Sequence, residues 1–121
     1  MLILLIFLKV ATLGLGTDFP VEEINPFLTL RAAVLRMDKH DYPNNGFLTN
    51  EALDLSTALK GMTIWPQFAS FSEAERGMLI QGMEATFFIC AKPISSKEIP
   101  VDNYAKATFV RGKKVFDAVS F

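Results

Sequence analysis

The stretch from Phe71 to Cys90 constrains the fold most strongly, because it combines a start signal, an apolar periodicity and a stop signal. Ser72 and Glu75 match the S-x-x-E capping box, in which two side chains satisfy free backbone N–H groups at a helix start. Apolar side chains then recur at helical spacing, at Leu79, Met83, Phe87 and Cys90. Lys92-Pro93 ends the run, because proline has no backbone N–H. The pattern predicts a helix over this whole stretch.

Three further helices are expected. Asn25-Pro26 is typical of a helix start, since asparagine caps and proline suits the first helical position, and this helix should end near Met37. A second helix is expected between a cap at Thr49 or Asn50 and a stop at Gly61. The last should follow Asp102 and bury one apolar face, formed by Ala105, Thr108, Phe109, Gly112, Val115, Phe116 and Val119. The predicted fold is all-α, a small bundle of four to five helices with an apolar N-terminal segment.

The composition divides the chain into three parts. Residues 1–16 are strongly apolar and resemble a secretory signal or an anchor that contacts a membrane or a partner, and a buried strand or helix is the alternative. Lys9 interrupts this run, which is shorter than the ~20 residues of a spanning helix. Residues 17–24 are interpreted as a linker and 25–121 as a helical domain. The expected location is therefore exported, lumenal or membrane-associated.

Few residues suggest chemistry. His40 and Cys90 are the only histidine and cysteine, which excludes a zinc site of the Cys/His type and an internal disulfide. Asp41 and Gly46 match the first and sixth positions of an EF-hand calcium loop, but Pro43 and Ala52 occupy its third and twelfth positions. We therefore expect no catalytic residues, no bound metal and no cofactor. The net charge of −1 argues against a nucleic-acid partner.

Several short motifs follow one another in an order that resembles a known family. They are Phe71-Ser-Glu-Ala-Glu75, Gly82-Met83, Lys92-Pro93 and Val101-Asp-Asn-Tyr104. Between Leu53 and Arg111 the chain resembles the N-terminal helical dimerisation domain of FKBP-type peptidyl-prolyl isomerases. The isomerase domain of that family is missing from the 121 residues. The resemblance therefore implies helical dimerisation or client contact and not isomerase catalysis.

These observations favour a non-catalytic helical protein-interaction module, exported or tethered to a membrane, over an enzyme. The alternatives are a small accessory or structural subunit of a membrane protein complex and a secreted helical carrier of an apolar ligand. The expected partner is another protein or a second copy of the chain, with possible membrane contact through Met1–Gly16. The candidate partner-binding residues are apolar and follow the middle of the chain: Trp65, Phe68, Leu79, Met83 and Phe87.

Overall fold

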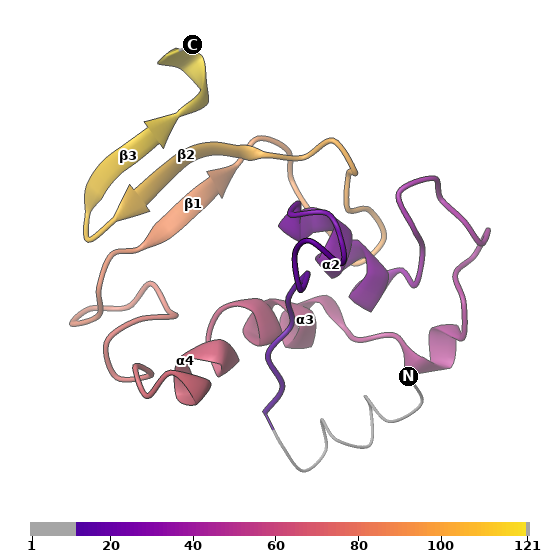
Figure 1. The fold of residues 1–121 in the computed structure, drawn as a ribbon, viewed down its shortest axis with the longest axis horizontal. Coiled ribbons are helices and arrows are strands. Elements are labelled where there is room, and N and C mark those ends of the chain that lie inside the picture. Colours follow the sequence, from indigo (N-terminus) through magenta and orange to yellow (C-terminus); the bar gives the residue numbers. More distant parts are fainter. Residues whose placement is uncertain (1–11, 121) are drawn as a thin grey trace.

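The computed structural model describes residues 12–120 and shows a mixed fold of short helices and one antiparallel sheet (Figure 1). Its α-helices are α2 (Pro26–Val34), α3 (Leu55–Met62) and α4 (Trp65–Ala69), and its 3-10 helices are η1 (Thr49–Glu51) and η2 (Ala118–Ser120). The sheet has the order β1 (Phe87–Cys90), β2 (Ala105–Val110) and β3 (Lys113–Asp117). The prediction of an all-α bundle is therefore wrong.

The core is built around α2. Its members come from α2, from α3 and the residues just before it, and from the connection between β1 and β2: Phe27, Leu30, Ala33, Val34, Leu53, Ala58 and Ile99. Ile99 is fully buried, although it lies in a long connection between two strands. The extended segment before α2 joins this body through Leu15, whose N–H donates to the Gly61 carbonyl at 2.8 Å. The helices and the long connection thus share one apolar interior.

The start of α2 is as predicted, and its end is not. The Asn25 side chain accepts a hydrogen bond from the Phe27 N–H at 3.0 Å, and Pro26 occupies the first turn. The helix ends at Val34, before the expected end near Met37. Arg36 has a φ of +60°, which a right-handed helix does not contain. The chain therefore leaves the helix one turn early.

The start of α3 lies later than the sequence suggested. Thr49 and Asn50 belong to η1, and the cap of α3 is Asp54. One Asp54 carboxylate oxygen accepts from the Thr57 N–H at 2.9 Å and the other from the Thr57 hydroxyl at 2.5 Å. These hydrogen bonds, first that of the hydroxyl and then that of the backbone, lower the pKa of Asp54 below its ordinary value of 3.8.

We expect Asp54→Ala to lower the free energy of unfolding by about 1 kcal/mol at pH 7, as loss of a helix cap does. The folded-state pKa lies below the unfolded one, so this stabilisation is complete above the unfolded value and is lost as the pH falls through the folded value. In urea unfolding, the difference between wild type and variant should therefore shrink below the ordinary value of 3.8. Glu98→Ala, an exposed control, should change little at either pH. A cap effect that persists undiminished in strong acid would contradict this assignment.

The predicted helix from Phe71 to Cys90 is wrong, because its capping box belongs to the end of α4. The Ser72 N–H donates to the Gln67 carbonyl at 2.9 Å, and the Phe71 N–H donates to the Phe68 carbonyl at 3.2 Å. Phe71 has a φ of +56°. This is the hydrogen-bond pattern of a Schellman motif, which terminates a helix. The Ser72 hydroxyl donates to the Gln67 side chain at 3.0 Å and so caps no following helix.

The rest of that stretch forms turns and then a strand. Gly77 and Gly82 have φ values of +107° and +94°, which no α-helix accommodates. Phe87–Cys90 then pairs with β2, and the rings of Phe87 and Phe109 stack with centroids 4.8 Å apart. Aromatic and β-branched residues favour such pleated surfaces. Tertiary pairing therefore overrides the helical spacing of the apolar residues.

The predicted last helix is a β-hairpin instead. β2 and β3 pair antiparallel, with Val110 opposite Lys113, and Arg111 and Gly112 form the two-residue loop. Both loop residues have positive φ, +52° and +75°, as a type I′ turn requires. Apolar residues lie on both sides of this short sheet, and Val110 and Val115 are partly exposed. The sequence therefore lacks the strict alternation that identifies a strand.

Two features bear on the predicted apolar segment. Residues 1–11 lie outside the described part of the chain, so the signal or anchor prediction falls mostly outside the structure. From Thr12 onward, none of the helices is both long enough and apolar enough to span a bilayer.

Candidate active site

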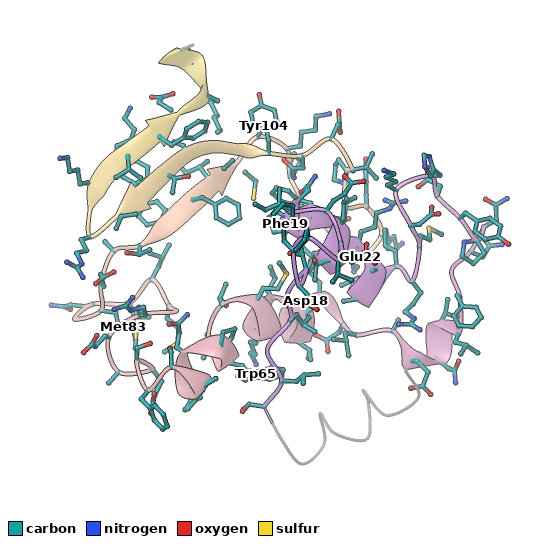
Figure 2. The ribbon with its side chains drawn as sticks, in the orientation of Figure 1. Asp18, Phe19, Glu22, Trp65, Met83 and Tyr104 are labelled. Carbon is teal, nitrogen blue, oxygen red and sulfur yellow. The ribbon has the colours of Figure 1, made fainter. Side chains whose placement is uncertain are left out.

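Asp18 lies in a tight turn between an extended segment and α2. Residues 12–16 run extended beside α3, and the chain turns at 18–20. Asp18 has a φ of +51°, and its carbonyl accepts from the Val21 N–H at 2.9 Å. Its side chain is exposed beside those of Phe19 and Glu22 (Figure 2). An exposed carboxylate is thus held in the turn that precedes α2.

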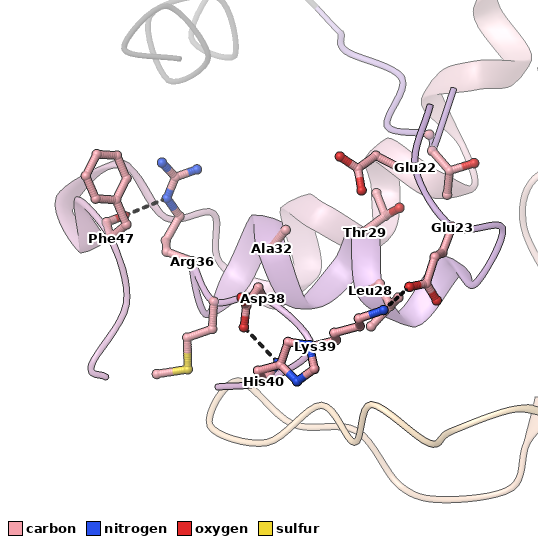
Figure 3. Close-up of a pocket in the computed structure, with 13 residues that line it drawn as sticks. Glu22, Glu23, Leu28, Thr29, Ala32, Arg36, Asp38, Lys39, His40 and Phe47 are labelled. Atoms are coloured by element: carbon pink, nitrogen blue, oxygen red, sulfur yellow. Dashed lines mark hydrogen bonds and ion pairs between the residues drawn. The ribbon is translucent and has the colours of Figure 1, made fainter. Parts of the chain in front are cut away.

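A cavity of about 710 Å³ begins at the same turn. Gly16 and Thr17, immediately before Asp18, form part of its wall, together with Glu22 and Glu23. One face of α2 and the loop that follows it complete the wall, through Leu28, Thr29, Ala32, Arg36, Met37, Asp38, Lys39, His40 and Phe47. Figure 3 shows Arg36 and Phe47 at one end of this set and Glu22 and Glu23 at the other.

Two of the acidic groups in this cavity are already engaged. The Asp38 carboxylate accepts from the N–H groups of His40 at 2.7 Å and Tyr42 at 2.9 Å, and the Tyr42 and His40 hydrogen bonds hold the pKa of Asp38 below its ordinary value. Lys39 forms an ion pair with Glu23, and this hydrogen bond raises the pKa of Lys39. Backbone N–H groups therefore hold the Asp38 carboxylate, and a lysine of the wall pairs with Glu23 (Figure 3).

The loop behind the cavity is held by Arg31, which is only 6% exposed. Its Nε donates to the Asp38 carbonyl at 2.9 Å, and its Nη1 donates to the buried Ile99 carbonyl at 2.9 Å. Its Nη2 forms an ion pair with Asp41. Arg31 therefore connects α2 to the loop after it and to the connection between β1 and β2.

The structure distributes the predicted partner-binding residues over three elements. Trp65 and Phe68 lie on α4, Leu79 and Met83 lie in the segment between α4 and β1, and Phe87 lies on β1 against Phe109. Figure 2 shows Trp65 and Met83 at separate places. Phe68 and Leu79 are exposed, whereas the other three are half-buried. None of these five residues belongs to the Asp18 turn or lines the cavity. Their role in partner binding stays a prediction.

Within residues 12–120, no three histidine, cysteine, aspartate or glutamate side chains come together as a metal centre requires. Cys90 is half-buried in β1, and burial raises the pKa of its thiol. The groups described in this part of the chain thus do not form a metal site by themselves. Asp18 and the polar side chains of the cavity wall are the candidate groups for catalysis and binding.

Comparison with known proteins identifies the chain's relatives. The amidohydrolase family matches residues 10–116, which include the Asp18 turn, the cavity wall and all of the sheet except Asp117. This chain belongs to the amidohydrolase family. The Arabidopsis thaliana relative "Protein LONG AFTER FAR-RED 3" is 35% identical over 109 residues, which are 88% of this chain and 18% of the relative. The Bacillus subtilis relative "Putative amidohydrolase YtcJ" is 30% identical over 74 residues, which are 61% of this chain and 14% of the relative.

The amidohydrolase chain therefore spans less than a fifth of the length of these curated relatives. No solved structure matches it. Membership of a hydrolase family overturns the resemblance to the FKBP dimerisation domain, whose motifs proved to be a helix end, turns and strands. It also overturns the expectation of a non-catalytic interaction module, an accessory subunit or a carrier, and the expectation that the chain is not an enzyme.

The sequence analysis missed the turn and the cavity for identifiable reasons. Residues 17–24 are short and polar, so they were interpreted as a linker. The signal was the acid at Asp18, which lies between an apolar run and the well-capped helix that starts after Asn25. Arg36 lies beyond the end of α2, where the sequence predicted that the helix continues, and its side chain is buried.

Proposed function

We propose that this chain forms part of the active-site region of an enzyme that hydrolyses amide bonds, and that Asp18 acts as its water-activating carboxylate. In this reaction, water adds to the carbonyl carbon and its proton passes to Asp18. The C–N bond then breaks and the leaving nitrogen takes a proton, so the products are a carboxylic acid and an amine. A positioned carboxylate is a suitable general base for this proton transfer.

The family match over residues 10–116 is the observation that supports this proposal most strongly. The geometry adds support, because Asp18 is exposed, is held in a hydrogen-bonded turn and follows two residues that line the cavity. A substrate in the cavity would therefore contact the two residues that precede Asp18.

The test is a hydrolysis assay with the purified protein and a panel of N-acetylated amino acids and amines. We expect release of acetate and free amine in equal amounts, at a rate proportional to the protein concentration. Heat-unfolded protein provides the blank. A folded protein that releases neither product from any member of the panel above the uncatalysed rate would contradict the proposal.

A further inference from the structure

The strand β1 (Phe87–Cys90) forms one edge of the sheet, and its outer side has no partner strand in the described part of the chain. The strand order is β1-β2-β3, so β1 pairs with β2 alone (Figure 1). Within residues 12–120, its backbone forms hydrogen bonds to β2 and to no other segment. Its side chains are also poorly covered, since Phe88 is 45% exposed and Ile89 is 47% exposed. An unpaired edge strand is a template on which another strand can form hydrogen bonds.

The backbone groups that face this open edge can be identified from the hydrogen bonds on the other side of the strand. The Ala91 N–H donates to the Tyr104 carbonyl at 2.9 Å. The Gly112 N–H donates to the Ala85 carbonyl at 2.8 Å. Residues 85 and 91 therefore turn backbone groups toward β2 and its hairpin. Successive residues of a strand alternate in this direction, so Phe88 and Cys90 present their N–H and carbonyl groups to the open edge.

The opposite edge of the sheet is protected, and the β1 edge is not. The edge strand β3 carries Lys113, Lys114 and Asp117, and charged side chains on an edge strand oppose pairing with a further strand. Residues 85–91 contain no charged residue and no proline. The chain thus blocks one edge of the sheet and leaves the other open, which favours a partner strand at β1.

The charges that flank β1 favour a second copy of the chain as this partner. Glu84 precedes the uncharged residues 85–91, and Lys92 follows them. In an antiparallel pair of two copies centred on Phe88, each Glu84 lies opposite Lys92 of the second copy, whereas a parallel pair would place like charges together. The same centre brings the outward backbone groups of the two Phe88 residues opposite each other. Charge and hydrogen bonding thus specify the same register.

We propose that β1 is a dimerisation surface, on which two copies of this chain pair antiparallel about a two-fold axis at Phe88. The two sheets then form one continuous sheet of six strands, with a charged β3 at each outer edge. Both copies use the same surface, as in most homodimers. Glu84 and Lys92, which pair with Arg111 and Asp102 in the single chain, extend these ion pairs across the interface. The dimer forms whether or not the chain hydrolyses amides.

The first test measures the molar mass by size-exclusion chromatography with light scattering, over about 1–200 µM protein, a range that brackets micromolar dissociation constants. We expect the mass to rise with concentration toward twice 13.5 kDa. Ile89→Lys should raise the dimer Kd by at least about 10-fold, because it places two added charges on one face of the paired strands. Val115→Lys is the matched control, since Val115 is 56% exposed on β3, and it should dimerise like wild type. A wild type that stays monomeric, or equal effects of the two lysines, would overturn the proposal.

The second test uses charge reversal, in which misfolding cannot produce the expected result. Glu84→Lys and Lys92→Glu should each raise Kd by about 10-fold or more, because each places like charges opposite one another at both ends of the pair. An equimolar mixture of the two variants should form a heterodimer with nearly wild-type affinity, because both opposite-charge pairs are restored. Circular dichroism checks that each variant is folded. A mixture that associates no more tightly than the separate variants would contradict the proposal.

Hydrogen exchange distinguishes a second copy from any other occupant of the edge. The amides of Phe88 and Cys90 should exchange more slowly as the wild-type concentration rises, and this protection should be lost in Ile89→Lys. Protection of the same amides in a monomeric sample would mean that another part of the chain covers β1, and the dimerisation surface would then be rejected.

Discussion

Replacing Asp18 with asparagine is expected to lower kcat for amide hydrolysis by about 100- to 10,000-fold, the range associated with loss of general acid–base catalysis. Asparagine keeps the size of the side chain but cannot take a proton from water. KM should change less than kcat, because asparagine at position 18 leaves the residues that line the cavity unchanged. Steady-state acetate release measures both constants.

The Asp18→Asn variant should remain folded, which makes the loss interpretable. Position 18 has a φ of +51°, and asparagine tolerates this region of backbone conformation better than most residues. The hydrogen bond from the Val21 N–H goes to the backbone carbonyl, so it is retained. Asp102→Asn serves as the matched control, since Asp102 pairs with Lys92 on another loop. An Asp18→Asn protein with wild-type kcat would remove Asp18 from the mechanism.

Replacing Arg31 with methionine is expected to lower the free energy of unfolding by about 2–4 kcal/mol, because a buried acceptor loses its donor. The Ile99 carbonyl is buried and accepts from Nη1 at 2.9 Å. The substitution also removes the donor to the Asp38 carbonyl and the ion pair with Asp41. Methionine fills much of the same apolar volume, so the loss reports mainly on the polar contacts. Urea unfolding followed by circular dichroism measures the difference.

Arg111→Met is the matched control for this substitution. The Arg111 side chain is 75% exposed and pairs with Glu84 at 3.1 Å, and exposed ion pairs contribute about 0–1 kcal/mol. The Arg31 variant should therefore unfold at clearly lower urea concentration than the Arg111 variant. Equal destabilisation of the two variants would mean that the contacts of Arg31 add nothing beyond an ordinary surface pair.

The sequence predicted those elements whose signals are local. Asn25-Pro26 identified the start of α2 because the cap and the proline act within one turn. The helix that ends near Gly61 was also recognised, although its true cap is Asp54. The local cap was therefore enough to predict the start of α2, whereas α3 was recognised without its true cap.

The sheet was not predicted, because its strands depend on each other. β1 has four residues, and its two middle residues, Phe88 and Ile89, are both exposed, so it shows no alternation. What makes it a strand is its partner β2, some twenty residues later, with Phe87 opposite Phe109. The hairpin did carry a local signal, Arg111-Gly112 between two runs of strand-forming residues. The helical spacing of the surrounding apolar residues masked it.

The candidate site was equally hard to recognise from the sequence. A single acid in a short polar segment has no spacing that distinguishes it from a linker, and Asp18 gains meaning only from the turn and the cavity beside it. Arg36 is separated from Phe47 by a loop whose path depends on Arg31 and Asp38. The positions of these residues depend on tertiary packing, which a short sequence motif does not predict. The match to the amidohydrolase family, and no short motif, indicated that this region belongs to a hydrolase.

The connection between β1 and β2 affects how the protein unfolds. Its ends belong to the sheet, but its middle contributes Ile99 to the interior beneath α2, and its backbone is tied to Arg31. Pulling this connection away from α2 would expose this isoleucine and remove the carbonyl that accepts from Arg31 Nη1. The connection between the two strands is therefore held to the helices by a buried side chain and by a buried hydrogen bond.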